Sequence, residues 1–77
     1  MKIDSLITMA NQIGAFFHGE GGQDHPEEAA KLTATHLRRY WEPRMRTQII
    51  EYFNSNGGEG LDDVAKSGVA LLATGRI

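Results

Sequence analysis

The 77-residue sequence predicts an all-α fold, a small single domain of three to four short helices that covers residues 1–77. Apolar side chains recur at the three- and four-residue spacing of a helix face in successive segments. Glycine and proline separate these segments, and none shows the apolar–polar alternation of a half-buried strand. Because the connections are short, we expect neighbouring helices to pack antiparallel.

The first helix is expected over about residues 5–17. Asp4 or Ser5 can cap its free N–H groups, and the glycine-rich stretch HGEGGQDHP ends it. The residues expected on its buried face are Leu6, Met9, Ala10, Ile13, Phe16 and Phe17.

The second helix has a sharply marked start. Asp24 and Glu27 have the spacing of a capping box, and Pro26 suits a first turn. We expect this helix to end at Tyr40 or Trp41. Its buried face is small at the start and bulky at the end, and consists of Ala29, Ala30, Thr33, Leu37, Tyr40 and Trp41.

Pro43 marks a corner after the second helix, because proline disfavours helical geometry in the preceding residue yet suits a first helical position. A third helix is therefore expected over about residues 43–54, ending in a left-handed turn at Gly57 or Gly58. Its buried row is Met45, Ile49 and Phe53, flanked by Ile50 and Tyr52.

A fourth helix follows the segment GEGL. Apolar spacing runs from Leu61 to Leu72, with Asp62 and Asp63 in the first turn, where acidic groups favour the helix dipole. We expect the final segment, ATGRI, to fray.

Composition restricts both stability and function. A chain of this length buries only about 60% of its unfolded surface, and the absence of cysteine excludes disulfides and cysteine-based zinc sites. A protein partner is then the attractive source of further stability. The net charge of −2 gives no general attraction to nucleic acid or anionic membrane. Polar residues interrupt the N-terminal apolar run, and no run approaches the ~18 apolar residues of a membrane span, so we expect neither a signal peptide nor a membrane span. The lack of cysteine fits a cytoplasmic location, where thiols are kept reduced.

No arrangement of residues indicates catalysis or metal binding. There is no cysteine nucleophile and no GxSxG turn, and the spacing of His18, His25 and His36 does not link them to a serine. His25 and Glu28 could share a helix face, but two ligands are too few for a metal site. We expect no catalytic, cofactor-binding or metal-binding residue in this chain, and the histidines have no assigned role.

The segment THLRRYWEPRMRTQI, residues 35–49, contains half of all the basic residues: Arg38, Arg39, Arg44 and Arg46. One interpretation is a solvated helix face whose arginines cover a buried Tyr40 and Trp41. A second is a free-standing nucleic-acid-binding protein that uses the four arginines. A third is a protein interface, because tryptophan, tyrosine, arginine and methionine are enriched at interface centres.

The first helix has an unusual polar segment, ANQIGAFF. Gly14 in mid-helix costs about 1 kcal/mol relative to alanine, which close approach of another helix would explain. The amides of Asn11 and Gln12 either face water or hydrogen-bond the backbone of a partner.

Three blocks together resemble a known family: MANQIGAFF (9–17), HLRRYWEPRMR (36–46) and GGEGL (57–61). They are similar to the delta subunit of cytoplasmic NAD-dependent, molybdenum-containing formate dehydrogenases. The resemblance covers about residues 5–61 and weakens after Leu61, where this chain continues DDVAKSGVALL. That difference leaves room for a complex with a related molybdenum or tungsten enzyme.

The resemblance implies a non-catalytic subunit of a hetero-oligomer that stabilises the large catalytic subunit or assists its assembly or cofactor insertion. It also implies that partner subunits carry the bis-pterin molybdenum or tungsten cofactor, the iron–sulfur clusters and FMN. No nucleic acid is then expected as a partner. Combined with the interface interpretation above, it predicts as partner-binding residues Arg38, Arg39, Tyr40, Trp41, Pro43, Arg44, Met45, Arg46, Asn11 and Gln12, with Trp41 and Met45 as apolar anchors.

Overall fold

The computed structural model describes residues 1–75 and consists of four α-helices, with no strand in that range. The all-α prediction is therefore confirmed. The helices are α1 (Ile3–Phe17), α2 (Pro26–Tyr40), α3 (Pro43–Asn56) and α4 (Asp63–Thr74), and a short wide turn, η1 (His18–Gly22), follows α1. The last two residues of the predicted domain, and with them the end of ATGRI, lie outside the described residues.

The helix ends agree with the sequence in most places but not in their N-terminal caps. α2 and α3 each begin with proline in the first turn, and α3 ends at Gly57 with a left-handed φ of 69°, as predicted. The predicted cap of α2 is wrong: His25 occupies the cap position, and no side chain caps the helix. Asp24 lies one residue too early, because Pro26 already fills the first helical position.

The start of α1 differs in the same way. The helix begins at Ile3, so that Asp4 lies in the first turn and neither it nor Ser5 acts as the cap. The carbonyl oxygen of Lys2 instead accepts hydrogen bonds from the N–H groups of Ser5 (3.0 Å) and Leu6 (3.3 Å). Backbone bonding alone thus closes the first turn.

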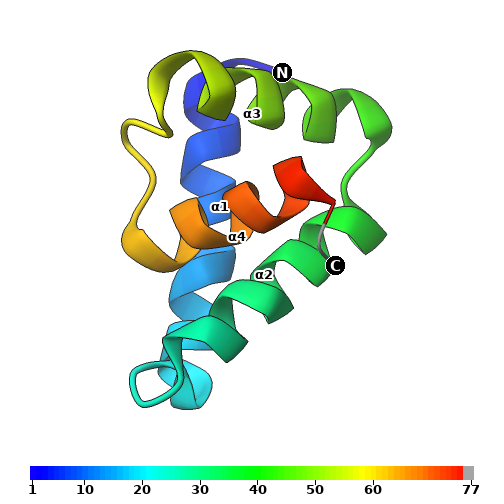
Figure 1. Ribbon diagram of the computed structural model, residues 1–77. Coiled ribbons are helices and arrows are strands. Elements are labelled where there is room, and N and C mark those ends of the chain that lie inside the picture. The colour runs from blue at the N-terminus through cyan, green and yellow to red at the C-terminus, as the bar shows by residue number, and fades with distance from the viewer. Residues whose placement is uncertain (76–77) are drawn as a thin grey trace.

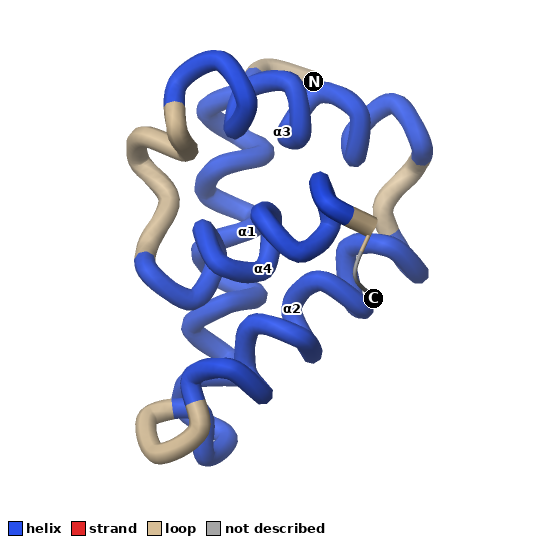
Figure 2. The backbone as a smooth tube through the Cα atoms, viewed as in Figure 1, coloured by secondary structure: helices blue, strands red, loops and turns tan. Residues whose placement is uncertain are grey.

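The helices enclose α4 (Figure 1). α1 and α2 run in opposite directions and diverge from the turn that joins them, α3 crosses the open end, and α4 lies in the middle. Figure 2 shows that the loops are short, with the longest before α4. Because α1 and α2 diverge, the C-terminal end of α2 is not covered by α1. No helix within residues 1–75 has both the length and the apolar character needed to cross a membrane.

The core is formed by one cluster to which all four helices, the α2–α3 corner and the loop before α4 contribute. Its buried members are Leu6, Ala10, Leu37, Trp41, Ile49, Leu61, Ala65 and Val69. Half-buried apolar residues, Met45 and Phe53 among them, pack around it. No buried side-chain nitrogen or oxygen in the described part of the chain lacks a hydrogen-bond partner. The core is therefore small, but it forms one cluster and its buried polar groups are hydrogen-bonded.

Two glycines allow α4 to pack closely against its neighbours, one against α1 and one against α2. A Cβ atom on Gly14 would lie 2.9 Å from the backbone nitrogen of Ala65, so α1 and α4 meet there without a side chain between them. A Cβ atom on Gly68 would lie 2.7 Å from Cγ2 of Thr33, at the contact between α4 and α2. The expected reason for a mid-helix glycine at position 14 is therefore confirmed.

Candidate partner-binding surface

The corner between α2 and α3 is held by Arg46. Its Nη1 atom donates hydrogen bonds to the carbonyl oxygens of Arg38 (2.7 Å) and Trp41 (2.9 Å). These carbonyls lie at the C-terminal end of α2, where backbone acceptors lack partners within the helix and the helix dipole favours a positive charge. Arg46 therefore joins the first turns of α3 to the end of α2, and its guanidinium is engaged within the chain.

Trp41 belongs to the interior side of the corner. It leaves the helix in an extended conformation (φ −82°, ψ 141°), and its side chain is only 5% exposed. An indole buried to this degree has almost no surface to give to a partner, so in this conformation the apolar anchor expected at Trp41 is part of the core. Met45, the other expected anchor, is half-buried and packs against the same cluster.

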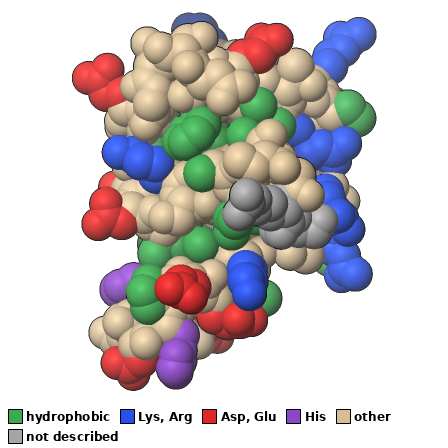
Figure 3. Space-filling view, in the orientation of Figure 1, with side chains coloured by type: hydrophobic (Ala, Val, Ile, Leu, Met, Phe, Trp, Pro, Cys, Tyr) green, Lys and Arg blue, Asp and Glu red, His purple; other side chains and the backbone are tan. Residues whose placement is uncertain are grey.

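The outer side of the corner is exposed and cationic. Tyr40 is 70% exposed, and Pro43 and the three arginines at positions 38, 39 and 44 are exposed as well. Arg39 and Arg44 make no hydrogen bond or ion pair within residues 1–75. Lys and Arg side chains gather beside this corner in Figure 3, whereas the His side chains and several Asp and Glu side chains lie at the opposite end, around the turn between α1 and α2; other Asp and Glu side chains are spread over this face.

Asn11 holds the loop that leads into α4. Its Nδ2 donates to the carbonyl oxygen of Gly60 (3.0 Å), and its Oδ1 accepts from the N–H of Asp62 (2.8 Å). Both polar atoms of the Asn11 amide thus hydrogen-bond the backbone of this chain. The sequence led us to expect that the amide either faces water or bonds the backbone of a partner, and neither is the case for Asn11. Gln12 is exposed and makes no side-chain hydrogen bond within the described residues.

Four rings form a continuous row across the surfaces of α1 and α2. The ring centroids of Phe16 and Phe17 are 5.2 Å apart, those of Phe17 and His36 are 6.3 Å apart, and those of His36 and Tyr40 are 4.8 Å apart. Phe16 is 61% exposed at one end and Tyr40 is 70% exposed at the other. We call Phe16, Phe17, His36 and Tyr40 the aromatic row.

The aromatic row borders two shallow hollows. One, of about 220 Å³, is lined by Gln12, Ile13, Phe16, Phe17 and His36. The other, of about 100 Å³, lies beyond Phe17, where Leu32, Glu20 and Glu28 are among its lining residues. Acidic residues therefore lie beside Phe17, in the interior of the row, while Arg39 adjoins Tyr40 in sequence at one end.

The sequence placed Phe16 and Tyr40 on buried helix faces, and this is wrong. Both lie near the C-terminal end of their helix. A helical pattern does not reveal that α1 and α2 diverge, and that divergence leaves Tyr40 without a covering helix (Figure 1). The spacing of Leu32, His36 and Tyr40, four residues apart, was the signal available in the sequence for a second exposed stripe on α2.

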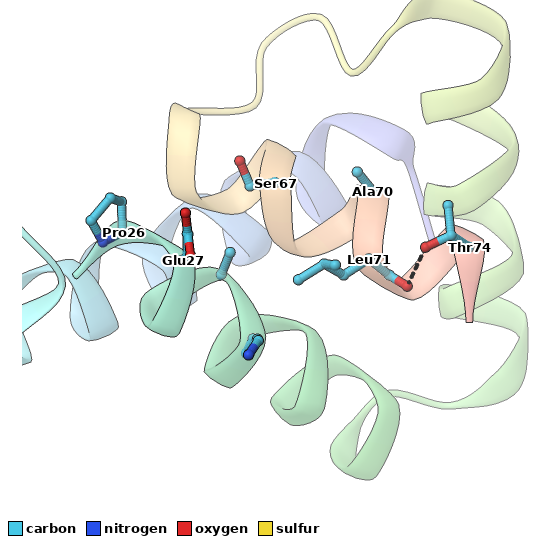
Figure 4. A pocket seen from close by; sticks show the side chains of 8 residues that line it. Pro26, Glu27, Ser67, Ala70, Leu71 and Thr74 are labelled. Atoms are coloured by element: carbon cyan, nitrogen blue, oxygen red, sulfur yellow. Dashed lines mark hydrogen bonds between the residues drawn. The ribbon is translucent and has the colours of Figure 1, made fainter. Parts of the chain in front are cut away.

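A separate groove lies between α2 and α4. It has a volume of about 550 Å³, and its lining is mostly apolar. Figure 4 shows side chains reaching it from both helices, with Thr74 hydrogen-bonded to the carbonyl oxygen of Leu71 at 3.1 Å. The lining residues are Pro26, Glu27, Ala30, Lys31, Ser67, Ala70, Leu71 and Thr74, and none is among the ten predicted partner-binding residues.

The three histidines do not meet. His18 and His25 are exposed at the C-terminal cap of α1 and the N-terminal cap of α2, and His36 belongs to the aromatic row. Across residues 1–75, no three His, Cys, Asp or Glu side chains gather as a metal-ligand group.

Comparison with known proteins gives one match. Residues 5–69 match the family model described as NADH-dependant formate dehydrogenase delta subunit FdsD. The chain belongs to the FdsD family. The match extends past Leu61, the point at which the resemblance in the sequence weakens, and so includes most of α4. No curated protein and no solved structure matched the chain.

The structure shows where the three blocks that resemble the family lie. The block at 36–46 forms the α2–α3 corner, with Trp41 and Arg46 on its inner side. The blocks at 9–17 and 57–61 meet each other, because Asn11 of the first hydrogen-bonds Gly60 of the second. The partner-binding role of the ten predicted residues stays a prediction, with Trp41, Arg46 and Asn11 now placed in contacts within the chain.

Proposed function

We propose that this FdsD-family chain is a non-catalytic subunit of a cytoplasmic NAD-dependent formate dehydrogenase, or of a closely related enzyme, and that it binds and stabilises the large catalytic subunit. The family description supports membership of a multi-subunit enzyme, because a delta subunit implies other subunits in a hetero-oligomer. The chemistry of this chain supports an accessory role through its exposed surface rather than through an active-site cavity.

The observation that carries this proposal is the division of the α2–α3 corner into two sides. Inside, Trp41 is buried and Arg46 fixes the end of α2. Outside, Arg39, Tyr40 and Arg44 are exposed on backbone that is already held in place. A preorganised surface loses little conformational freedom on binding, and arginine can form paired hydrogen bonds with carboxylates. The corner therefore suits a partner surface with acidic groups or free carbonyls.

The cofactors of such a complex belong to its other subunits in this proposal. The catalytic subunit would hold a pterin-bound molybdenum or tungsten and iron–sulfur clusters, and a further subunit would hold FMN and exchange electrons with NAD. The delta chain would act on that machinery indirectly, by stabilising the folded catalytic subunit or by helping its assembly and cofactor insertion.

Co-purification tests the proposal. The tagged chain is expressed together with the catalytic subunit, and we expect the two to elute together at physiological salt. Reversal of charge in the Arg39→Glu, Arg44→Glu double variant should weaken the complex at least tenfold, because both arginines are exposed and engaged by nothing else in residues 1–75. Replacement of Lys66, an exposed cation on α4, by Glu is the matched control and should leave binding unchanged.

Co-purification, a titration with DNA and RNA at increasing salt, and analysis of the cofactor-loaded enzyme separate three possibilities. If the wild-type chain elutes alone at low and at physiological salt, the proposal is wrong. If it binds DNA or RNA with an affinity that falls steeply with salt, the nucleic-acid hypothesis is favoured instead. If the chain stays in the purified, cofactor-loaded enzyme, it is a resident subunit; release after loading would identify it as an assembly factor.

A further inference from the structure

We infer that the aromatic row is the apolar centre of the surface that binds the catalytic subunit, and that it fits an apolar depression on that subunit with carboxylates at the Tyr40 end. This inference rests on the proposed function, and it names the face of the chain that docks. The face runs along α1 and α2 and is continuous with the outer side of the α2–α3 corner, where Arg39 and Arg44 lie.

The first argument is that large rings are exposed although the core forms one buried cluster without them. Phe16 and Tyr40 are mostly exposed, and Leu32 on the same stripe of α2 is 42% exposed. These side chains are not surplus from a poorly packed core, since eight buried residues form one cluster without them. Adjacent exposed aromatic side chains of this kind are typical of the centre of a protein interface.

The second argument is that the row is already ordered. Phe17 and His36 are half-buried, and their rings connect the two exposed ends through edge-to-face and tilted contacts. These contacts restrict the rotamers of Phe17 and His36 before binding, which lowers the entropic cost of association. Gln12 lies beside Phe16 at the 220 Å³ hollow with its amide free of other described residues, so it can bond a backbone group of the partner.

Charge sets the orientation of the partner. Glu20 and Glu28 line the hollow beside Phe17, and Arg39 directly precedes Tyr40, which ends the row on α2. The complementary surface consequently presents basic groups beside Phe17 and acidic groups beside Tyr40. A partner docked in the reverse direction would place like charges against each other.

Area argues against a second copy of this chain that binds through the aromatic row alone. A fully covered aromatic side chain buries about 150–250 Å², so the exposed parts of Phe16 and Tyr40 amount to roughly 200–350 Å². A stable interface needs about 800 Å² from each side. A second copy bound through the row alone would therefore bury too little area, and the proposed function supplies a larger partner that can also cover the arginine corner.

The test uses the full-length chain and the purified catalytic subunit, with affinity measured by titration. We expect the Phe16→Ser, Tyr40→Ser double variant to bind at least tenfold more weakly while its circular dichroism and thermal midpoint stay close to those of the wild type. The matched control is Glu51→Ser, Lys66→Ser, which changes exposed residues on α3 and α4 and should bind like the wild type. A photo-crosslinking phenylalanine analogue at position 16 or 40 should attach to the catalytic subunit, and one at position 51 or 66 should not.

Negative results would show whether the docking face or the proposed function itself is wrong. If the wild-type chain and the double variant bind equally well, or if crosslinks form only from positions 51 and 66, the docking face is wrong while the proposed function stands. If the wild-type chain does not bind, the proposed function fails and the docking face fails with it. If the row variants instead abolish self-association of the isolated chain, the occupant is a second copy and the inference is overturned.

Discussion

The two halves of α2 serve different purposes. The first half is packed tightly: Ala29, Ala30, Thr33 and Ala34 are all buried, and the hydroxyl of Thr33 bonds the carbonyl oxygen of Ala29 at 2.8 Å. The second half is divided, with Leu37 and Trp41 buried but Tyr40 and the arginines outside. Small side chains at one end place α4 against α2, and that contact leaves the other end free to present a surface.

Trp41 and Tyr40 show this division within two adjacent residues. Their side chains are 5% and 70% exposed, although both are large aromatics in the same segment of sequence. Trp41 lies four residues after the buried Leu37 and its N–H bonds the Leu37 carbonyl oxygen, so it continues the buried face, whereas Tyr40 lies four residues after the half-buried His36. The inner side of the corner therefore contributes to folding, and the outer side is available for binding.

Replacement of Trp41 by alanine should have the largest effect. Truncation of a buried tryptophan costs about 3–5 kcal/mol, and a chain of this length has a free energy of unfolding of about 4–12 kcal/mol. We expect the isolated Trp41→Ala chain to lose most of its helical circular dichroism or to unfold at a much lower urea concentration. Tyr40→Ala is the matched control and should stay folded, because its ring is exposed.

The comparison would break down if the two variants behaved alike. A Trp41→Ala chain that keeps the wild-type unfolding midpoint would show that the indole is not part of the core. A Tyr40→Ala chain that unfolds would show that the aromatic row is structural.

Gly68→Ala should have an intermediate effect on the first half of α2. The new Cβ would lie 2.7 Å from Cγ2 of Thr33 and 3.3 Å from the carbonyl oxygen of Ala30, so α2 and α4 must separate. Overpacking costs about 1–3 kcal/mol, and the better helix propensity of alanine returns about 1 kcal/mol. Because the new atom would also lie 2.9 Å from Cβ of Thr33, the overpacking cost should fall in the upper half of that range, and we expect a net loss of about 1–2 kcal/mol in urea unfolding.

A second substitution sharpens this test. Thr33→Ser removes Cγ2, so it should reduce the cost of Gly68→Ala when the two are combined, as a double-mutant cycle would show. Ser67→Ala changes an exposed neighbour on the same helix and should alter stability by no more than about 0.5 kcal/mol. A Gly68→Ala chain as stable as the wild type would contradict the close contact between the helices.

The sequence was sufficient to predict the positions of the helices, but not which residues of different helices contact each other or which side chains stay exposed. Apolar spacing, Pro26, Pro43 and Gly57 located the four elements, because these are local properties of the chain. The role of Asn11 was not predictable in this way, since its hydrogen bonds join residues 49 and 51 positions apart. The exposure of Tyr40 also depends on how α1 and α2 diverge, which is a tertiary property. The sequence therefore predicted where the helices lie, whereas the long-range partners of Asn11 and the exposure of Tyr40 required the tertiary structure.

Arg46→Met should have the smallest effect of the three, and it tests whether the inner side of the corner holds the outer side in place. Methionine keeps an apolar stem but cannot donate to the carbonyl oxygens of Arg38 and Trp41. Hydrogen bonds from a charged group contribute about 1.5–3 kcal/mol, but Arg46 is only half-buried and water can replace part of the loss, so we expect about 1 kcal/mol. Arg44→Met, on the exposed side of the same corner, is the control and should be nearly neutral.

Hydrogen exchange near the corner shows whether Arg46 holds the last turn of α2 in place or only contacts it. The N–H of Trp41 bonds the carbonyl oxygen of Leu37 at 3.1 Å, in the last turn of α2. If Arg46 holds that turn, hydrogen exchange at the Trp41 amide should become faster in Arg46→Met than in Arg44→Met, while amides in the first half of α2 keep their protection. Equal exchange in the two variants would mean that the corner stays fixed without the guanidinium, and that packing of the Trp41 side chain alone presents Tyr40 and Arg39 to the partner.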